Sequence, residues 1–359
     1  MHIVMPGAAR YINEAGILNN LNHYLKDYGK RPFILAGKKA YQAVEGYLNL
    51  AEYNIRQQTF IGECSYENIN LYAKIAVEHQ SDAVIGIGGG KSIDTAKAVA
   101  ARLDIPFISI PTVASTCAAW TPLSVIYTVE GSFIEYIVYP KGPALVLVDP
   151  NVLINSPVRY FLAGIGDTFA KYYEADALCQ QVQLNVAAQA GLLMAKLSLT
   201  VLREQSESAL QGIKEQRINE AFNNILDTIF MAGGLVGGLG DKYGRIAAAH
   251  SIHNGLTNIA ETHHLYHGEK VAYGILVQLV LEKRPEEMIK ETIQLFARLN
   301  LPVTYQDLGI KQSHVETVAK ATCAKGESIH LMPFPISSED VIDAMERLEE
   351  LVSFNALNL

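Results

Sequence analysis

The chain contains 359 residues, of which 49% are hydrophobic and 18% charged, so its composition predicts a folded protein and gives no indication of disorder. A net charge of −8 with dispersed basic residues disfavours nucleic acid or an anionic membrane as partner and favours a small-molecule substrate. The four cysteines lie far apart without a C-x-x-C pair, which disfavours a thiolate zinc site and predicts reduced, buried thiols.

The N-terminal sequence MHIVMPGAAR lacks the basic and apolar regions of a secretion signal. No uncharged apolar stretch is long enough to cross a bilayer. We therefore expect a cytoplasmic protein without a membrane partner.

Residues 1–156 alternate short β-rich runs with helical stretches, which is typical of an α/β domain. Ser65 is predicted to cap a helix whose apolar positions begin at Ile69. Two runs, 124–128 and 133–138, predict a hairpin. Continuous apolar runs bounded by glycine, proline or aspartate predict parallel strands covered on both faces, at 33–36, 83–87, 107–110 and 145–148. In such a sheet, ligands bind at the carboxyl ends of the strands.

Residues 157–359 are predicted to form an all-helical second domain, because no proline occurs between Pro157 and Pro285 and the apolar spacing changes to 3.6 residues. The run 186–202 is apolar nearly all round, which predicts a helix at the centre of a bundle. A terminal helix is predicted from near Ser338. Two domains suit the chain length at about 150 residues per domain, and we expect them to meet across a cleft.

A glycine-rich turn joins a predicted strand to a helix in DAVIGIGGGKSIDTAKA, which contains Gly88, Gly89 and Gly90. Backbone N–H groups of such a turn can approach a pyrophosphate, at which the positive end of the helix is aimed. The segment is not a Walker A loop, which needs glycine at Ile85, nor a G-x-G-x-x-G motif, which needs glycine at Lys91. A tight structural turn is the alternative interpretation, but Lys91 and the nearby Asp94 favour a ligand site.

A second group of polar residues occurs in GIGDTFAKYYEA, AAAHSIHNGLT and LYHGEK. We predict a turn at 164–166 that leads into a helix with Asp167 at its start. His250, His253 and His267 follow later in the helical part. One carboxylate and two imidazoles from separate helices can hold zinc or ferrous iron and leave positions open for a substrate oxygen. Helical histidines are also often ordinary polar residues, so the spacing alone leaves both interpretations open.

Together these segments resemble the iron-containing alcohol dehydrogenase superfamily, and within it the glycerol dehydrogenase family, over nearly the whole chain. The matching stretches are GIGGGKSIDTAKA, PTVASTCAAWTPLSVIYT, GIGDTFAKYYEA, AAAHSIHNGLT and HGEKVAYG. The resemblance implies a metal-dependent NAD(P)(H) oxidoreductase that forms homo-oligomers. It also implies the dehydroquinate synthase-like fold, a Rossmann-like parallel-sheet domain (1–156) followed by a helical-bundle domain (157–359), with the metal in the cleft between them.

The family's site residues can be assigned in this sequence from their positions in the matching motifs. The resemblance implies that Asp167, His250 and His267 bind the metal and that His253 faces the nicotinamide or the substrate. The positions that match cofactor contacts are Gly88, Gly89, Gly90, Lys91, Asp94, Thr112, Ser115, Thr121, Leu123 and Tyr127.

Two departures from the family concern the substrate and the cofactor. Cys117 stands where glycerol enzymes carry an aspartate that helps to hold the triol, which argues against glycerol. After the first predicted strand the chain reads Gly37, Lys38 and Lys39, where NAD-dependent relatives place an aspartate. Two cations favour a 2′-phosphate, so we predict a preference for NADP(H) over NAD(H). The alternative is that both lysines are ordinary solvated surface residues.

Two further cations concern the substrate pocket. Lys171 lies one turn beyond Asp167, and Arg245 lies five residues before His250, where glycerol enzymes carry small residues. Either cation can bind a carboxylate, or can instead pair with acidic neighbours. With Cys117, these features resemble a hydroxycarboxylate dehydrogenase branch, so we expect reduction of small 2-oxo acids to 2-hydroxy acids. The alternatives are a glycerol or vicinal-diol dehydrogenase and a redox-neutral carbocycle synthase related to dehydroquinate synthase.

Overall fold

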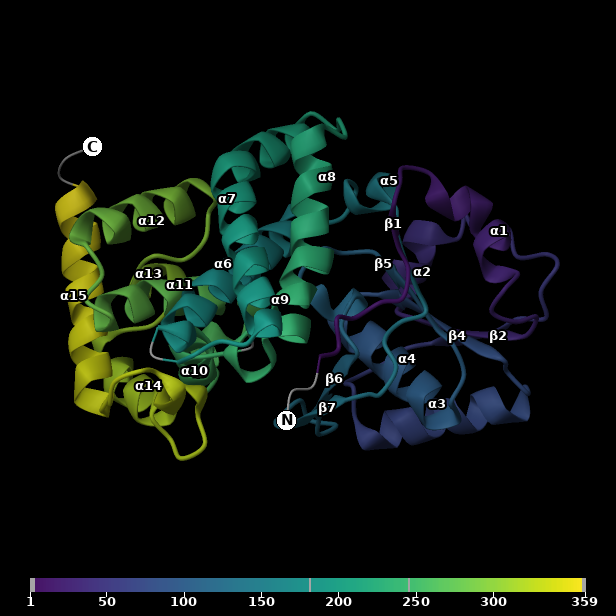
Figure 1. The fold of residues 1–359 in the computed structure, drawn as a ribbon, viewed down its shortest axis with the longest axis horizontal. Coiled ribbons are helices and arrows are strands. Elements are labelled where there is room, and N and C mark those ends of the chain that lie inside the picture. The colour runs from purple at the N-terminus through teal and green to yellow at the C-terminus, as the bar shows by residue number, and fades with distance from the viewer. Residues whose placement is uncertain (1–3, 181, 245, 357–359) are drawn as a thin grey trace. The chain divides into compact units, whose positions relative to one another are not determined.

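A computed structural model describes residues 4–180, 182–244 and 246–356, which divide into two compact units (Figure 1). The sheet unit contains residues 5–158 and 209–238, and the helical unit contains Val4 and the described residues of 159–208 and 239–356. The segment 209–238, assigned from sequence to the second domain, therefore packs within the sheet unit. The predicted domain boundary between residues 156 and 157, like the cleft between the domains, stays a prediction.

The sheet unit is built on a six-stranded parallel sheet with the strand order β1-β8-β5-β4-β2-β3. The strands are β1 (Tyr11–Asn13), β2 (Pro32–Ala36), β3 (Arg56–Thr59), β4 (Ala83–Gly88), β5 (Phe107–Pro111) and β8 (Leu145–Val148). Every residue of β2, β4, β5 and β8 is buried, which confirms the four strands predicted from apolar runs. The edge strands β1 and β3 are half-buried or exposed; β1 is only three residues long (YIN) and β3 is polar (RQQT), so neither gave an apolar run.

Helices and a hairpin complete the part of the sheet unit before residue 159. They are α1 (Leu21–Leu25), α2 (Lys38–Val44), α3 (Tyr66–Glu78), α4 (Gly90–Leu103) and α5 (Pro150–Leu153), with β6 (Leu123–Tyr127) paired antiparallel to β7 (Phe133–Val138). The predicted hairpin is thus confirmed. Ser65 caps α3 as predicted, because its side chain accepts a hydrogen bond from the Asn68 N–H. Helix α4 packs against β4 and α3.

The segment 209–238 adds α8 (Glu220–Asp227), a π-helical turn (Thr228–Ala232) and the start of α9 (Gly233–Gly240) to the sheet unit. The Tyr11 hydroxyl of β1 donates a hydrogen bond of 2.7 Å to Asp227. Trp120 packs against Gly234, where an added Cβ would lie 2.3 Å from the indole Cδ1. Glycine is therefore required at this position for the segment to pack on the indole.

The helical unit contains most of α6 (Val158–Cys179) and of α7 (Val186–Lys214), together with α10 (Ala248–Leu256), α11 (His267–Leu281), α12 (Glu286–Arg298), α13 (Tyr305–Leu308), α14 (Val315–Thr322) and α15 (Ser338–Ala356). The helical second part and the terminal helix from Ser338 are thus confirmed. Helix α11 is almost completely buried and packs against α10 and α15.

Helix α7 differs from its prediction as a central bundle helix. Val186, Leu193 and Leu197 are 82%, 61% and 50% exposed, so one apolar face of α7 is open among the described residues. The apolar run was misread because composition alone does not show which faces find a packing partner. By length and composition this helix could also cross a membrane, but a single such helix is weak evidence.

Candidate active site

The candidate site begins at a close crossing of two buried helices, α6 and α11. A Cβ on Gly268 would lie 1.8 Å from the Ala163 carbonyl oxygen, and a Cβ on Gly166 would lie 2.4 Å from the Gly268 oxygen. Only glycine lets the two backbones approach so closely. The predicted turn at 164–166 is therefore wrong: α6 is continuous from Val158 to Cys179, and Gly166 serves helix packing instead.

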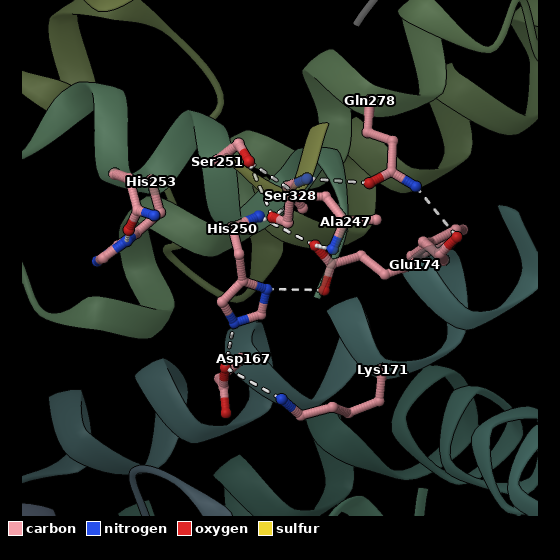
Figure 2. Close-up of polar contacts among 12 residues, drawn as sticks. Asp167, Lys171, Glu174, Ala247, His250, Ser251, His253, Gln278 and Ser328 are labelled. Carbon is pink, nitrogen blue, oxygen red and sulfur yellow. Dashed lines mark hydrogen bonds and ion pairs between the residues drawn. The ribbon is translucent and has the colours of Figure 1, made fainter. Parts of the chain in front are cut away.

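This crossing brings the next residue of α6, Asp167, beside the first residue of α11, His267. The Asp167 Oδ1 atom lies 3.3 Å from His267 Nε2 and 3.5 Å from His250 Nε2, which α10 contributes (Figure 2 shows Asp167 and His250). One ligand atom of each residue lies within 4.8 Å of the others. The three side chains that the sequence proposed as metal ligands therefore converge.

The donor set fits a divalent cation. Asp167 is only 3% exposed, yet its Oδ1 atom has no hydrogen-bond partner among the described residues. The Lys171 ammonium, 3.7 Å away, compensates part of the charge of this buried oxygen, and a bound cation would give the oxygen a direct partner. One carboxylate and two imidazoles suit zinc or ferrous iron and leave coordination positions open.

Nearby charges keep Asp167 ionised. Burial alone would raise the pKa of Asp167, but the Lys171 ammonium, 3.7 Å away, and the two imidazoles hold this pKa well below its ordinary value. Burial alone would lower the pKa of His250, but Glu174 and Asp167 raise it to about 9. Burial lowers the pKa of His267. Figure 2 shows Lys171 reaching Asp167 from one turn further along α6.

The glycine-rich turn lies at the carboxyl edge of the sheet. Gly88 ends β4 with a φ of 143°, which favours glycine, and a Cβ there would lie 2.3 Å from Ser92 Oγ. Helix α4 begins at Gly90 after the N-cap Gly89, which has no side chain to occupy the helix N-terminus. At Gly90 the atom nearest to an added Cβ would be Thr116 Oγ1, at 3.8 Å. This helix end is thus suited to receive a phosphate.

The predicted lysines lie at the same edge of the sheet. Strands β2 and β4 are parallel neighbours, with Ala36 paired to Ile87. Gly37 is the N-cap of α2, and the exposed Lys38 and Lys39 begin this helix just past the end of β2. The two cations and the glycine turn therefore belong to adjacent strand ends.

Comparison with known proteins shows the family to which the chain belongs. The family model for iron-containing alcohol dehydrogenase matches residues 8–150. Hydroxycarboxylate dehydrogenase A of Escherichia coli is 38% identical over 353 residues, covering 96% of this chain and 97% of that protein. The chain belongs to the iron-containing alcohol dehydrogenase family. It is accordingly an oxidoreductase that acts on CH–OH groups, in a family that uses NAD(P) and a divalent metal.

Several other relatives of this chain are named glycerol dehydrogenases. A glycerol dehydrogenase of Thermotoga maritima is 37% identical, covering 96% of this chain and 95% of that protein. The crystal structure of glycerol dehydrogenase from Schizosaccharomyces pombe matches with a TM-score of 0.87 at 31% identity, covering 98% of this chain and 91% of that one. The parallel-sheet and helical fold predicted for the dehydrogenase is thereby confirmed.

His253 of the dehydrogenase lies beside His267, one of the three candidate metal ligands. Its Nε2 atom is 3.0 Å from His267 Nδ1, and its Nδ1 atom is 3.0 Å from Asn254 Oδ1. Asn254 in turn donates to Glu327. Burial, followed by the charges of His267 and Lys270, holds the pKa of His253 well below its ordinary value. A neutral imidazole thus contacts a candidate metal ligand, while its role toward substrate or cofactor stays a prediction.

Asp94, predicted as a cofactor contact, is 7% exposed and is engaged by protein groups. Its carboxylate lies 3.0 Å from Lys97 Nζ and accepts a hydrogen bond of 3.1 Å from the Val125 N–H. Lys97 also donates to the carbonyls of Ala118 and Leu123. These contacts support a scaffolding role for Asp94 in holding the segment from η2 (Cys117–Ala119) to β6.

The remaining predicted residues are placed as follows. The Thr112 N–H donates to the Gly88 carbonyl, which holds the end of β5 beside the glycine turn. Lys91 pairs with Glu63 at 2.5 Å. Half-buried positions in or just before the hairpin are occupied by Ser115, Cys117, Thr121, Leu123 and Tyr127. Arg245 lies outside the described residues. Glu174, missed as a site residue, lies seven residues after Asp167 on α6, a helical spacing that could have revealed it.

Proposed function

We propose that this dehydrogenase reduces small 2-oxo acids to 2-hydroxy acids with NADPH. The carrying observation is the Lys171 ammonium, 3.7 Å from Asp167 Oδ1 with its side chain only 12% exposed. A buried ammonium beside the candidate metal site offers a substrate carboxylate a charged partner, which an uncharged polyol does not need. The similarity to hydroxycarboxylate dehydrogenase A supports this choice of substrate.

Each residue has a separate task in the proposed reaction. Asp167, His250 and His267 would hold zinc or ferrous iron. A bound cation would polarise the substrate oxygen, and a bound nicotinamide would exchange the hydride. Lys171 binds and orients the carboxylate, and Arg245 is proposed as a second carboxylate contact. His253 is proposed to lie on the proton path, since its ring is neutral and adjoins His267.

A steady-state screen tests the substrate. We expect 2-oxo acids to be turned over with a higher kcat/KM than glycerol or short diols, in the presence of zinc or ferrous iron. Lys171→Met should raise the KM for 2-oxo acids by about 10- to 100-fold, as expected for the loss of a hydrogen bond to a charged group. The KM for uncharged aldehydes should change far less in the same variant. Better turnover of glycerol than of any 2-oxo acid, or an unchanged KM in both Lys171→Met and Arg245→Ala, would refute the carboxylate site.

NADP(H) selectivity is proposed from Lys38 and Lys39, which are exposed beside the glycine turn. Replacing both by alanine should lower kcat/KM with NADPH and leave that with NADH nearly unchanged. Lys74→Ala is the matched control, because Lys74 is 77% exposed on α3 of the same unit. A wild-type enzyme that uses NADH as efficiently as NADPH would contradict the proposal.

Two alternatives are separated by the same experiments. A glycerol or vicinal-diol dehydrogenase is favoured by the names of several relatives, and the substrate screen decides it. A redox-neutral carbocycle synthase would show no net change in the absorbance of reduced nicotinamide. Homo-oligomer formation and a cytoplasmic location stay predictions.

A further inference from the structure

Helix α10, which carries His250, begins without a capping side chain of its own. Its N-cap is Ala247, and an alanine side chain cannot accept a hydrogen bond from the free N–H groups of the first turn. Glu174 of α6 supplies the acceptor instead. Its Oε1 atom accepts hydrogen bonds of 2.7 Å from the Ala247 N–H and 3.0 Å from the His250 N–H. A carboxylate here also interacts favourably with the positive end of the helix.

The second oxygen of Glu174 faces the His250 ring. Glu174 Oε2 lies 2.7 Å from His250 Nδ1, and the glutamate is only 1% exposed (Figure 2). An ionised carboxylate can only accept hydrogen bonds, so Nδ1 must carry a proton in this contact. With Nδ1 engaged by Glu174, Nε2 is the ring nitrogen left to bind a cation, and it faces Asp167 Oδ1 at 3.5 Å.

We propose that Glu174 is a positioning residue for the metal site. One oxygen caps α10, and the other fixes His250 in the tautomer whose Nε2 atom can bind a cation. The inference rests on the proposed metal-dependent function and adds a residue outside the ligand set to it. Carboxylates that orient a ligating imidazole in this way commonly contribute about 10- to 100-fold to metal affinity.

A neighbouring residue separates positioning from capping. Gln278 of α11 caps the same helix end, because its Oε1 accepts a hydrogen bond of 3.0 Å from the Ala249 N–H. Its amide nitrogen donates to the Tyr173 carbonyl and to Glu282 Oε1. None of these three contacts is to the His250 ring, so Gln278 contributes to the cap without bonding to the imidazole.

The test compares Glu174→Gln with Gln278→Met. The amide introduced by Glu174→Gln keeps one oxygen for the two backbone N–H groups but presents an amino group to His250 Nδ1. That contact favours a proton on Nε2 and opposes metal binding. We expect Zn²⁺ affinity, measured by chelator competition, to fall about 10- to 100-fold. The visible absorption of bound Co²⁺ should weaken at equal metal concentration. Gln278→Met should lower the Tm of the metal-free protein while its Zn²⁺ affinity stays within about threefold of wild type.

The outcomes are distinct. Wild-type Zn²⁺ affinity in Glu174→Gln would overturn the inference, as would a loss of affinity in both variants that follows their loss of Tm. A wild-type protein that binds neither Zn²⁺ nor Co²⁺ would refute the proposed function itself. If Glu174→Gln does not fold, ¹⁵N NMR of the histidine-labelled, zinc-loaded wild type decides. A proton on His250 Nδ1 is expected, and a proton on Nε2 overturns the inference.

Discussion

The buried ion pair between Asp94 and Lys97 leads to a quantitative prediction about the stability of the sheet unit. Asp94→Asn keeps the shape of the side chain but leaves the Lys97 ammonium, which is 2% exposed, without its counter-charge. Two unit charges 3.0 Å apart interact by about 5–6 kcal/mol at an effective dielectric constant of about 20. Removal of one partner of a buried pair typically costs about 3–5 kcal/mol. We therefore expect the free energy of unfolding to fall by about that amount.

Chemical denaturation measures this loss directly. Trp120 is the only tryptophan of the chain and belongs to the sheet unit, so its fluorescence reports on the unit that contains the pair. Asp104→Asn is the matched control, because Asp104 ends the same helix and pairs with Lys141 in an ion pair exposed by 77% and 75%. The control should change stability by less than about 1 kcal/mol.

The result also distinguishes a scaffold from a cofactor contact. If Asp94→Asn unfolds like Asp104→Asn while the Kd for NADPH rises, then Asp94 contacts the cofactor and the scaffolding role is wrong. If stability falls as expected and the folded variant binds NADPH within a few-fold of wild type, then the family position is occupied by a structural carboxylate in this chain.

Three further outcomes follow from the described contacts. Burial raises the pKa of Cys64 from 9.0 to about 12, so above pH 9 the thiol ionises in the unfolded protein before it does in the folded one. The free energy of unfolding should therefore fall by up to ~1.4 kcal/mol per pH unit above pH 9. Cys64→Ala should reduce that slope in denaturation curves at pH 9 and 10. Gly88→Ala forces a positive φ on a Cβ that meets Ser92, which should cost about 1–3 kcal/mol in the same measurement. Asp167→Asn should abolish zinc binding and turnover together. His253→Ala should lower kcat, while metal analysis still shows zinc bound at saturation. Zinc retained at full affinity in Asp167→Asn would contradict the ligand assignment.

Burial on both faces explains why the central strands were predictable. The runs at β2, β4, β5 and β8 are continuous and apolar because every residue is covered. The edge strand β3 has the sequence RQQT and is mostly exposed, so no hydrophobic period marks it. Local sequence therefore predicts the inner strands better than the edges of this sheet.

The candidate site shows the same division. Spacing and resemblance proposed Asp167, His250 and His267 as metal ligands, but neither could show that Gly166 serves a helix crossing rather than a turn. That function depends on Gly268, about a hundred residues away in the chain. Glu174 was also missed as a site residue, because its bonds to α10 form only in the folded protein.

The return of residues 209–238 to the sheet unit affects how this enzyme can be dissected and synthesised. A fragment that stops at residue 158 would lack the glycine that accommodates Trp120 and the carboxylate that receives the Tyr11 hydroxyl. The sheet unit cannot be excised by truncation alone and would need a splice that joins residue 158 to residue 209. On the ribosome, likewise, the sheet unit cannot reach its final packing until residue 238 has left the exit tunnel, well after all of its strands have been made.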